Sequence, residues 1–163
     1  RRDPKKIEHS ILSMIRQRVY AIALGYEDLN DHDTLRRDDL LKILAEQPKD
    51  LASSPTLCRF ENGIGREGLW AMSRVLVDAF VRSFDAPPEE VVLDMDATDD
   101  PVHGDQEGKF FHGYYDRYCF LPLYVFCGTQ LLVSYLRPSN IDGAKHSRPV
   151  MRLLCLGFTK TAS

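Results

Sequence analysis

The feature that most constrains the fold is a change of hydrophobic period at Pro87 and Pro88. Before these prolines, apolar residues recur every three to four positions, which is the period of amphipathic helices. After them, apolar residues alternate or form short runs separated by glycines, which is typical of strands and turns. We therefore expect a helical region at residues 1–86 and a region with strands at residues 87–163, which together make an α+β protein.

Helices are predicted where the apolar stripe is continuous and a proline or glycine ends it. The first is expected from about Lys5 to Leu24, and the second from Asp31 or Asp33 to Pro48. A short helix is expected within SSPTLCRFEN at 53–62, and a long one from about Leu69 to Phe84.

The second region reads as consecutive strands followed by a helix. The three strand segments are VVLDMD at 91–96, GYYDRYCFLPLYVFC at 113–127 and QLLVSYLRP at 130–138. Gly128 and Thr129 separate the last two segments and suit a hairpin turn. The prediction is a three-stranded antiparallel meander, followed by a helix from about Lys145 to Leu156.

Composition and charge describe an ordinary folded domain. The chain has 163 residues, of which 44% are hydrophobic and 28% charged, and its net charge is −3. No sequence-wide basic balance indicates a nucleic-acid partner, so DNA binding would need a local patch. Of the 21 Lys and Arg residues, 14 lie in residues 1–86, together with 14 of the 24 acids, so the acidic excess lies in the second region. The clustered cations either contact DNA phosphates or form a solvated surface, and the sequence leaves both alternatives open. They are Arg1, Arg2, Lys5, Lys6, Arg36 and Arg37.

Nothing in the sequence indicates a membrane or secreted protein. The longest apolar stretch, at 118–127, is about half of what a membrane-spanning helix needs and contains a proline. No signal peptide is recognisable, and the four cysteines form no Cys-x-x-Cys pair. We therefore expect a soluble cytoplasmic protein.

The acidic run that follows the first strand segment is the main candidate site. Alternate strand residues share a face, so Val91, Leu93 and Met95 should point into a core. Asp94 and Asp96 should then point to the other face, about 6 to 7 Å apart, where both can contribute to one cation site. The alternative is that Asp96 or Asp99 caps a turn.

The loop after this run adds aromatic residues and two histidines. Phe110, Phe111, Tyr114 and Tyr115 are suited either to stacking on bases or to filling a core. The two histidines of this loop lie nine residues apart, which matches no helical metal pair, so solvent contact or hydrogen bonding is the expected role.

Long stretches of the chain resemble a known family. The stretch LDMDATDDPVHGDQEGKFFHGYYDRYCFLPLYVFCGTQLLVSYLRPSNIDGAKHS, with ALGYEDLNDHDTLRRDDLL and LASSPTLCRFEN before it, is similar to the DDE-type transposases of bacterial insertion sequences, grouped as transposase DDE domain group 1. The resemblance covers roughly residues 1–148.

This resemblance implies the first part of a ribonuclease H-like core, in which the meander and helix follow a helical region used for DNA binding or assembly. It implies DNA strand cleavage and transfer with Mg²⁺ held by three acids. Asp96 best matches the first catalytic aspartate and metal ligand of the family, and Asp94 is the reserve candidate. The implied partners are the DNA ends of the element and a full-length transposase or a second copy.

The second and third acids of the family have no match in this sequence. After Asp116 the only acid is Asp142, and no glutamate follows Glu107. The closing GFTKTAS has no apolar run for the strand that would carry the second aspartate. We therefore expect a fragment that is inactive alone. The open alternatives are a regulator that binds DNA or transposase without catalysis, and a relic whose first strand exposes an unpaired edge.

Overall fold

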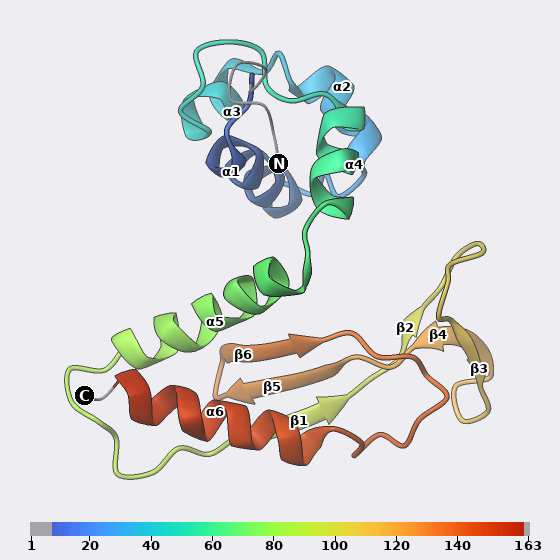
Figure 1. The fold of residues 1–163 in the computed structure, drawn as a ribbon. Coiled ribbons are helices and arrows are strands. Elements are labelled where there is room, and N and C mark those ends of the chain that lie inside the picture. Colours follow the sequence, from blue (N-terminus) through green and yellow to red (C-terminus); the bar gives the residue numbers. More distant parts are fainter. Residues whose placement is uncertain (1–7, 162–163) are drawn as a thin grey trace. The chain divides into compact units, whose positions relative to one another are not determined.

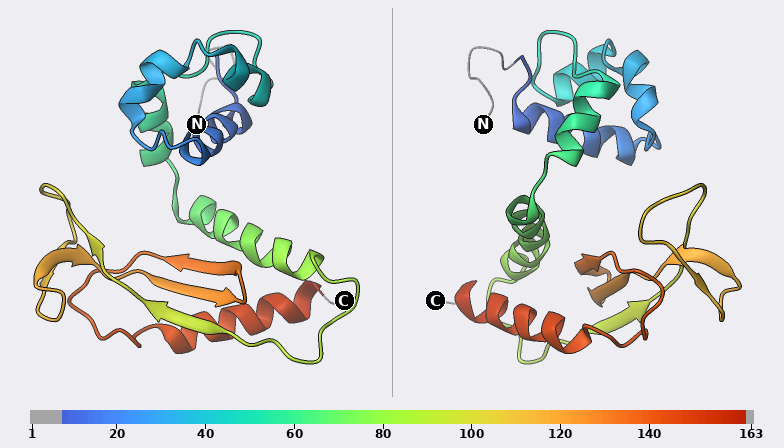
Figure 2. Two further views of the ribbon diagram at one scale, coloured as in Figure 1. Left: turned by 180° about the vertical axis from the view of Figure 1, so that it is seen from behind. Right: turned by 45° about the vertical axis from the view of Figure 1, so that its right-hand side comes forward.

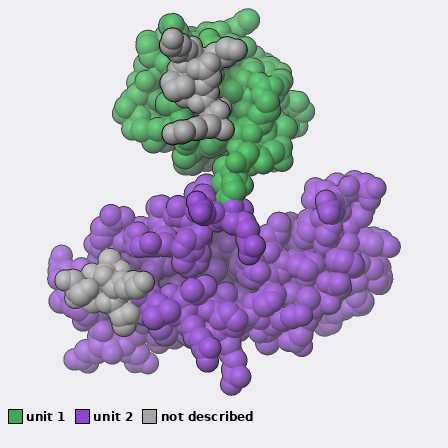
Figure 3. Space-filling view, viewed as in Figure 1, with its two compact units in different colours: residues 1–65 green, residues 66–163 purple. Residues whose placement is uncertain are grey.

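The computed structural model describes residues 8–161, and the side chains of residues 8–158. The chain divides into two compact units, residues 1–65 and residues 66–163, which Figure 3 distinguishes by colour. The described residues form six α-helices, one short 3₁₀-helix and two three-stranded antiparallel sheets. The predicted α+β class is therefore confirmed. Helix α5 (Arg66–Arg82) belongs to the same compact unit as the strands, and the functional division at residue 86 stays a prediction.

The first unit is built from short helices (Figure 1). They are α1 (Ile11–Ala23), η2 (Leu29–Asp31), α2 (His32–Leu35), α3 (Asp39–Leu44) and α4 (Ser54–Asn62). Helix α1 begins later than predicted, because the Ser10 hydroxyl accepts a hydrogen bond from the Ser13 N–H at 3.0 Å and caps it. Part of the predicted start, at Lys5, lies outside the described residues.

The predicted single helix from Asp31 or Asp33 to Pro48 is wrong, since the chain breaks between α2 and α3. Asp38 lies at the break in an extended conformation, with φ −67° and ψ 123°. Its carboxylate accepts a hydrogen bond from the Leu41 N–H at 2.8 Å and so starts a new helix. The period of the apolar residues alone predicted one helix, but an N-cap residue within the apolar stripe divides it into two.

A buried hydrogen-bond network holds the first unit together around Gln17. This side chain is fully buried, and its amide makes a two-way pair with the backbone of Ala52, donating to the carbonyl at 2.9 Å and accepting from the N–H at 3.0 Å. Gln17 Nε2 also lies 3.0 Å from Nδ1 of the buried His32. The network ties α1 to α2 and to the segment before α4. Apolar residues pack beside it in two clusters, whose buried members are Met14, Ala52 and Leu57, and Leu41, Ala45 and Leu51.

The second unit contains both sheets (Figures 1 and 2). The larger sheet has the order β1-β5-β6, formed by β1 (Asp94–Ala97), β5 (Leu123–Cys127) and β6 (Gln130–Tyr135). This is the predicted antiparallel meander, and Gly128 provides its hairpin turn with a φ of 56°. The smaller sheet has the order β2-β4-β3, formed by β2 (Asp100–Pro101), β4 (Arg117–Phe120) and β3 (Phe110–His112).

The predicted middle strand at 113–127 is divided between the two sheets. It becomes β4 and β5, separated by Leu121 and Pro122. Proline has no N–H to donate to a ladder, so pairing is interrupted at this point. Ala97 pairs with Leu123 in the larger sheet, and Asp100 pairs with Phe120 in the smaller one. The chain therefore bends at the end of β1.

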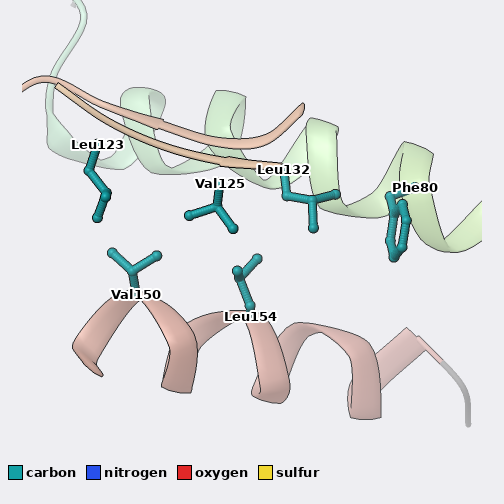
Figure 4. Packing of buried hydrophobic residues seen from close by; sticks show 6 residues of the cluster. All are labelled: Phe80, Leu123, Val125, Leu132, Val150 and Leu154. Carbon is teal, nitrogen blue, oxygen red and sulfur yellow. The ribbon is translucent and has the colours of Figure 1, made fainter. Parts of the chain in front are cut away.

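Helices α5 and α6 (Ser147–Thr161) supply the core that covers one face of the larger sheet. Figure 4 shows the side chains that meet there, and all are buried: Phe80, Leu123, Val125, Leu132, Val150 and Leu154. Val91, Leu93 and Met95 pack against this cluster, as their alternation predicted. None of the described helices is long and apolar enough to cross a membrane.

Candidate functional site

The candidate acids lie on the exposed face of strand β1. Asp94 and Asp96 are exposed, whereas Met95 between them is half-buried against the core. Asp94 lies opposite Phe126 and Asp96 opposite Tyr124 in the register with β5. The predicted placement of both carboxylates on one face of a strand is what the structure shows.

Neither carboxylate makes a hydrogen bond or an ion pair with the residues that the structure describes. Asp96 accepts no backbone N–H there, so the turn-capping alternative has no support from its contacts. Asp99 instead lies 3.8 Å from Nε of Arg117. The oxygens of Asp94 and Asp96 are thus available to solvent or to a ligand.

A half-buried tyrosine lies against the end of β1. The Tyr115 hydroxyl donates to the carbonyl of Ala97 at 3.5 Å, and its ring centroid lies 4.9 Å from that of His112. Burial raises the pKa of the Tyr115 hydroxyl, and the carboxylate of Asp99 and the neighbouring Tyr114 add to the rise, followed by Asp96. Tyr115 is therefore a neutral hydroxyl at neutral pH, beside the acidic strand end.

Strand β1 forms one edge of its sheet. It pairs with β5 on one side, and no strand among residues 8–161 pairs with its other side. The unpaired edge that the relic alternative implied is therefore present among these strands. An unpaired edge exposes a row of backbone N–H and C=O groups, which are able to pair with a further strand.

The described residues do not complete a magnesium site. Among them, no group of three or more His, Cys, Asp or Glu side chains is arranged to hold a metal ion. Mg²⁺ requires near-octahedral oxygen ligation and is usually bound through one or two carboxylates plus water and substrate phosphate. Asp94 and Asp96 provide oxygens of the right kind, but they do not form the three-acid set that two ions require.

The structure describes only some of the cations predicted to contact phosphate. Arg1, Arg2, Lys5 and Lys6 lie outside the described residues. Arg36 and Arg37 converge on Asp50, whose Oδ2 lies 3.8 Å from Arg36 Nη2 and 3.9 Å from Arg37 Nε. Lys42 Nζ lies 3.8 Å from the other oxygen of Asp50. Because Asp38 and Asp39 lie in the same segment, these cations do not outnumber the neighbouring acids.

The aromatic residues after β1 are mostly exposed and so are not core. Tyr114 is 86% exposed, Phe111 53% and Tyr118 55%. They belong to β3, β4 and the turn between them, in the smaller sheet. The two cations here are matched by acids, since Lys109 pairs with Asp105 at 3.0 Å and Arg117 lies near Asp99. The rings also contact one another edge to face, with centroids 5.6 Å apart for Phe111 and Tyr118 and 5.0 Å apart for Tyr114 and Tyr115.

Sequence reasoning missed one residue beside the site, Arg137. It lies in the loop after β6, is almost fully buried and donates hydrogen bonds to three backbone carbonyls. The same loop reaches the end of β1, where a methyl group added at Gly143 would lie 3.6 Å from Cβ of Ala97. An arginine at the end of an apolar strand segment gives no local signal of burial.

Comparison with known proteins gave one match. The model of the family described as "Transposase DDE domain group 1" matches residues 1–162. No curated protein and no solved structure matches the chain.

Proposed function

Because the chain belongs to the transposase DDE domain group 1 family, we propose that it acts in DNA transposition, with Asp96 as the first acid of the catalytic site. Asp94 is the reserve candidate, since it shares the exposed face of β1. The observation that carries this proposal is the pair of exposed carboxylates, free of hydrogen bonds and ion pairs among the described residues, on the first strand of an antiparallel meander. In a ribonuclease H-like core, this is where the first aspartate is expected.

Residues 1–163 would supply only part of the metal site. A bound Mg²⁺ would supply charge stabilisation and an activated oxygen for attack on a phosphodiester. Asp96 would contribute one carboxylate oxygen to it, and the second and third acids would have to come from elsewhere. Asp142 is the only acidic residue after Asp116 in the sequence, and no glutamate follows Glu107. We therefore propose that residues 1–163, acting alone, do not cleave DNA.

The proposed partner is the DNA of the element ends, contacted through the basic residues of the first region. Arg36 and Arg37 are the described candidates, and Arg1, Arg2, Lys5 and Lys6 are candidates from sequence. Support for a separate binding role comes from the first unit, which has its own buried clusters and hydrogen-bond network. A unit with its own core is suited to fold and bind without catalysis. The same observation supports the second candidate function, a regulator that occupies the ends or pairs with an active transposase.

Quantitative DNA binding tests the proposal. The chain is titrated with duplex carrying the ends of the element that encodes it, and with shuffled duplex, at several salt concentrations. We expect tighter binding to the ends and an affinity that falls steeply with salt, because phosphate contacts release counterions. Arg36→Gln combined with Arg37→Gln should reduce the salt slope by about two. Equal affinity for both duplexes would reject specific end recognition.

A matched control uses cations of the second unit. Among the described residues, Arg82 donates to the Asp78 carbonyl of its own helix alone, so Arg82→Gln should leave DNA affinity and salt slope unchanged. If this control, which removes one cation, lowers the salt slope about half as much as the double variant, which removes two, the effect reflects total charge rather than a contact surface.

A further inference from the structure

The loop after β6 contains a buried cation that forms no ion pair with the residues that the structure describes. Arg137 is 1% exposed. Its Nε donates to the Leu121 carbonyl at 2.8 Å, and its Nη1 donates to the carbonyls of Gly143, at 3.2 Å, and Lys145. Within the described part of the chain, Nη2 is buried without a hydrogen-bond partner. Burial lowers the pKa of Arg137 from its ordinary value, but an arginine side chain stays charged at neutral pH.

One set of bonds joins Arg137 to the bend that leads into β5, the strand that pairs with β1. Besides the side-chain bond, the Leu121 N–H donates to the Arg137 carbonyl at 2.8 Å, so the two residues are joined twice. Leu121 is buried and lies at the bend between β4 and β5. Leu123, two residues further on, pairs with Ala97, which follows Asp96. Arg137 therefore holds the backbone two residues before the one that pairs with Ala97.

The second set of bonds joins Arg137 to a turn that lies near β1. Nη1 holds the carbonyls of Gly143 and Lys145. The turn between them is closed by the Lys145 N–H, which donates to the Asp142 carbonyl at 3.0 Å. Gly143 lies so close to Ala97 that an added methyl group would just reach van der Waals contact. Arg137 thus holds a turn that lies near the residue that follows Asp96.

We propose that Arg137 is a positioning residue, which fixes the Asp96 end of β1 from two sides through the backbone of Leu121 and of Gly143. This inference rests on the proposed role of Asp96. Burying an unpaired cation is unfavourable, and only a planar guanidinium offers separate, rigidly placed donors for carbonyls that lie on different segments. Lysine carries one nitrogen and cannot reproduce this fork.

Amide hydrogen exchange in the metal-free chain tests the positioning directly. The variant is Arg137→Lys, which keeps the charge, and the control is Arg82→Gln. We expect the protected amides of Asp94–Ala97 to exchange about tenfold faster or more in Arg137→Lys, while those of Val125 and Leu132 keep their rates, because local opening is separable from global unfolding. Wild-type exchange in β1 of this variant would overturn the proposal.

A second pair of variants guards against a failure of Arg137→Lys to fold. Gly143→Ala adds a methyl group that fits beside Ala97 at ordinary van der Waals distance, whereas we expect the larger side chain of Gly143→Val to push the turn away from β1. We expect faster exchange in β1 for Gly143→Val and not for Gly143→Ala. Equal exchange in the two variants would overturn the proposed contact.

Binding of Mn²⁺ separates this inference from the proposed function. In the wild type, we expect Mn²⁺ to broaden the amide signals of Asp94–Ala97 selectively, and in Arg137→Lys we expect the same broadening to need about tenfold more metal, which corresponds to about 1.4 kcal/mol. Equal titrations in both proteins would overturn the positioning role. Absence of selective broadening in the wild type would instead reject Asp96 as a metal ligand, and the exchange rates would still decide the role of Arg137.

Discussion

Replacing Gln17 by leucine should unfold the first unit and leave the second intact. The change removes the partners of three buried groups: the Ala52 N–H, the Ala52 carbonyl and Nδ1 of His32. Each buried polar group left without a partner costs about 1 to 3 kcal/mol. Allowing for some relaxation, the total loss should be about 3 to 6 kcal/mol.

This loss is comparable to the whole stability of the unit. A unit of 65 residues is expected to have a free energy of unfolding of about 3 to 10 kcal/mol. Leucine resembles glutamine in size, so the loss arises from hydrogen bonds rather than from a cavity.

Two-dimensional amide NMR spectra report the two units separately. In Gln17→Leu, the dispersed signals of residues 8–65 should collapse, while those of β5 and β6 keep their positions. The control is Asn62→Ala, which removes an exposed amide that donates to the Cys58 carbonyl and should change stability by about 0.5 kcal/mol at most. Dispersed first-unit signals, with a loss of less than about 1 kcal/mol, would refute the reasoning.

Three further predictions concern His32, Leu132 and Asp96. Burial, followed by the Arg18 cation, lowers the pKa of His32 below 6.5, and both ring nitrogens face donors, from Gln17 and Arg18, so the protonated ring has no acceptor there. Because His32 binds a proton more weakly in the folded chain than in the unfolded one, the free energy of unfolding of the first unit should be constant above about pH 6.5 and fall below it. Urea titrations at several pH values check this. His32→Gln should make the free energy of unfolding less dependent on pH. Leu132→Ala removes a fully buried side chain and should cost the second unit about 2 to 5 kcal/mol, measured by the fluorescence of the single tryptophan, Trp70, during urea unfolding. Asp96→Asn should change stability by less than about 0.5 kcal/mol, since the carboxylate is exposed and unpaired among the described residues, and should abolish the Mn²⁺ broadening at β1; a large loss of stability would show a structural role instead.

The sequence predicted the helices and strands that are marked by the spacing of apolar residues near one another in the chain. The change of period at Pro87 separated helices from strands, and the alternation at 91–96 correctly assigned Met95 to the core face and Asp96 to the other. The break at Asp38 was missed because this residue is one of several acids in an unbroken apolar stripe, and only its capping hydrogen bond marks it. The smaller sheet was missed because its strands are very short and pair across turns.

In the candidate site, too, only the residues that follow a local pattern could be predicted. Exposure of Asp94 and Asp96 followed from a period of two, whereas burial of Arg137 depends on the Leu121 carbonyl, 16 residues away in the chain. Contacts of this kind arise from packing, and no spacing of residue types predicts them. The resemblance of the sequence to a transposase family identified the function class, and the structure showed how few metal ligands the described residues bring together.

A cleavage assay tests the central claim most directly. Supercoiled plasmid carrying the element ends is incubated with the purified chain in Mg²⁺ or Mn²⁺, beside the Asp96→Asn variant. Since the second and third acids of the family have no match in this sequence, in which Asp142 is the only acid after Asp116, we predict that neither protein nicks or linearises the plasmid at the ends, although the chain binds them. Metal-dependent nicking at the ends that disappears in Asp96→Asn would contradict the claim that the site is incomplete.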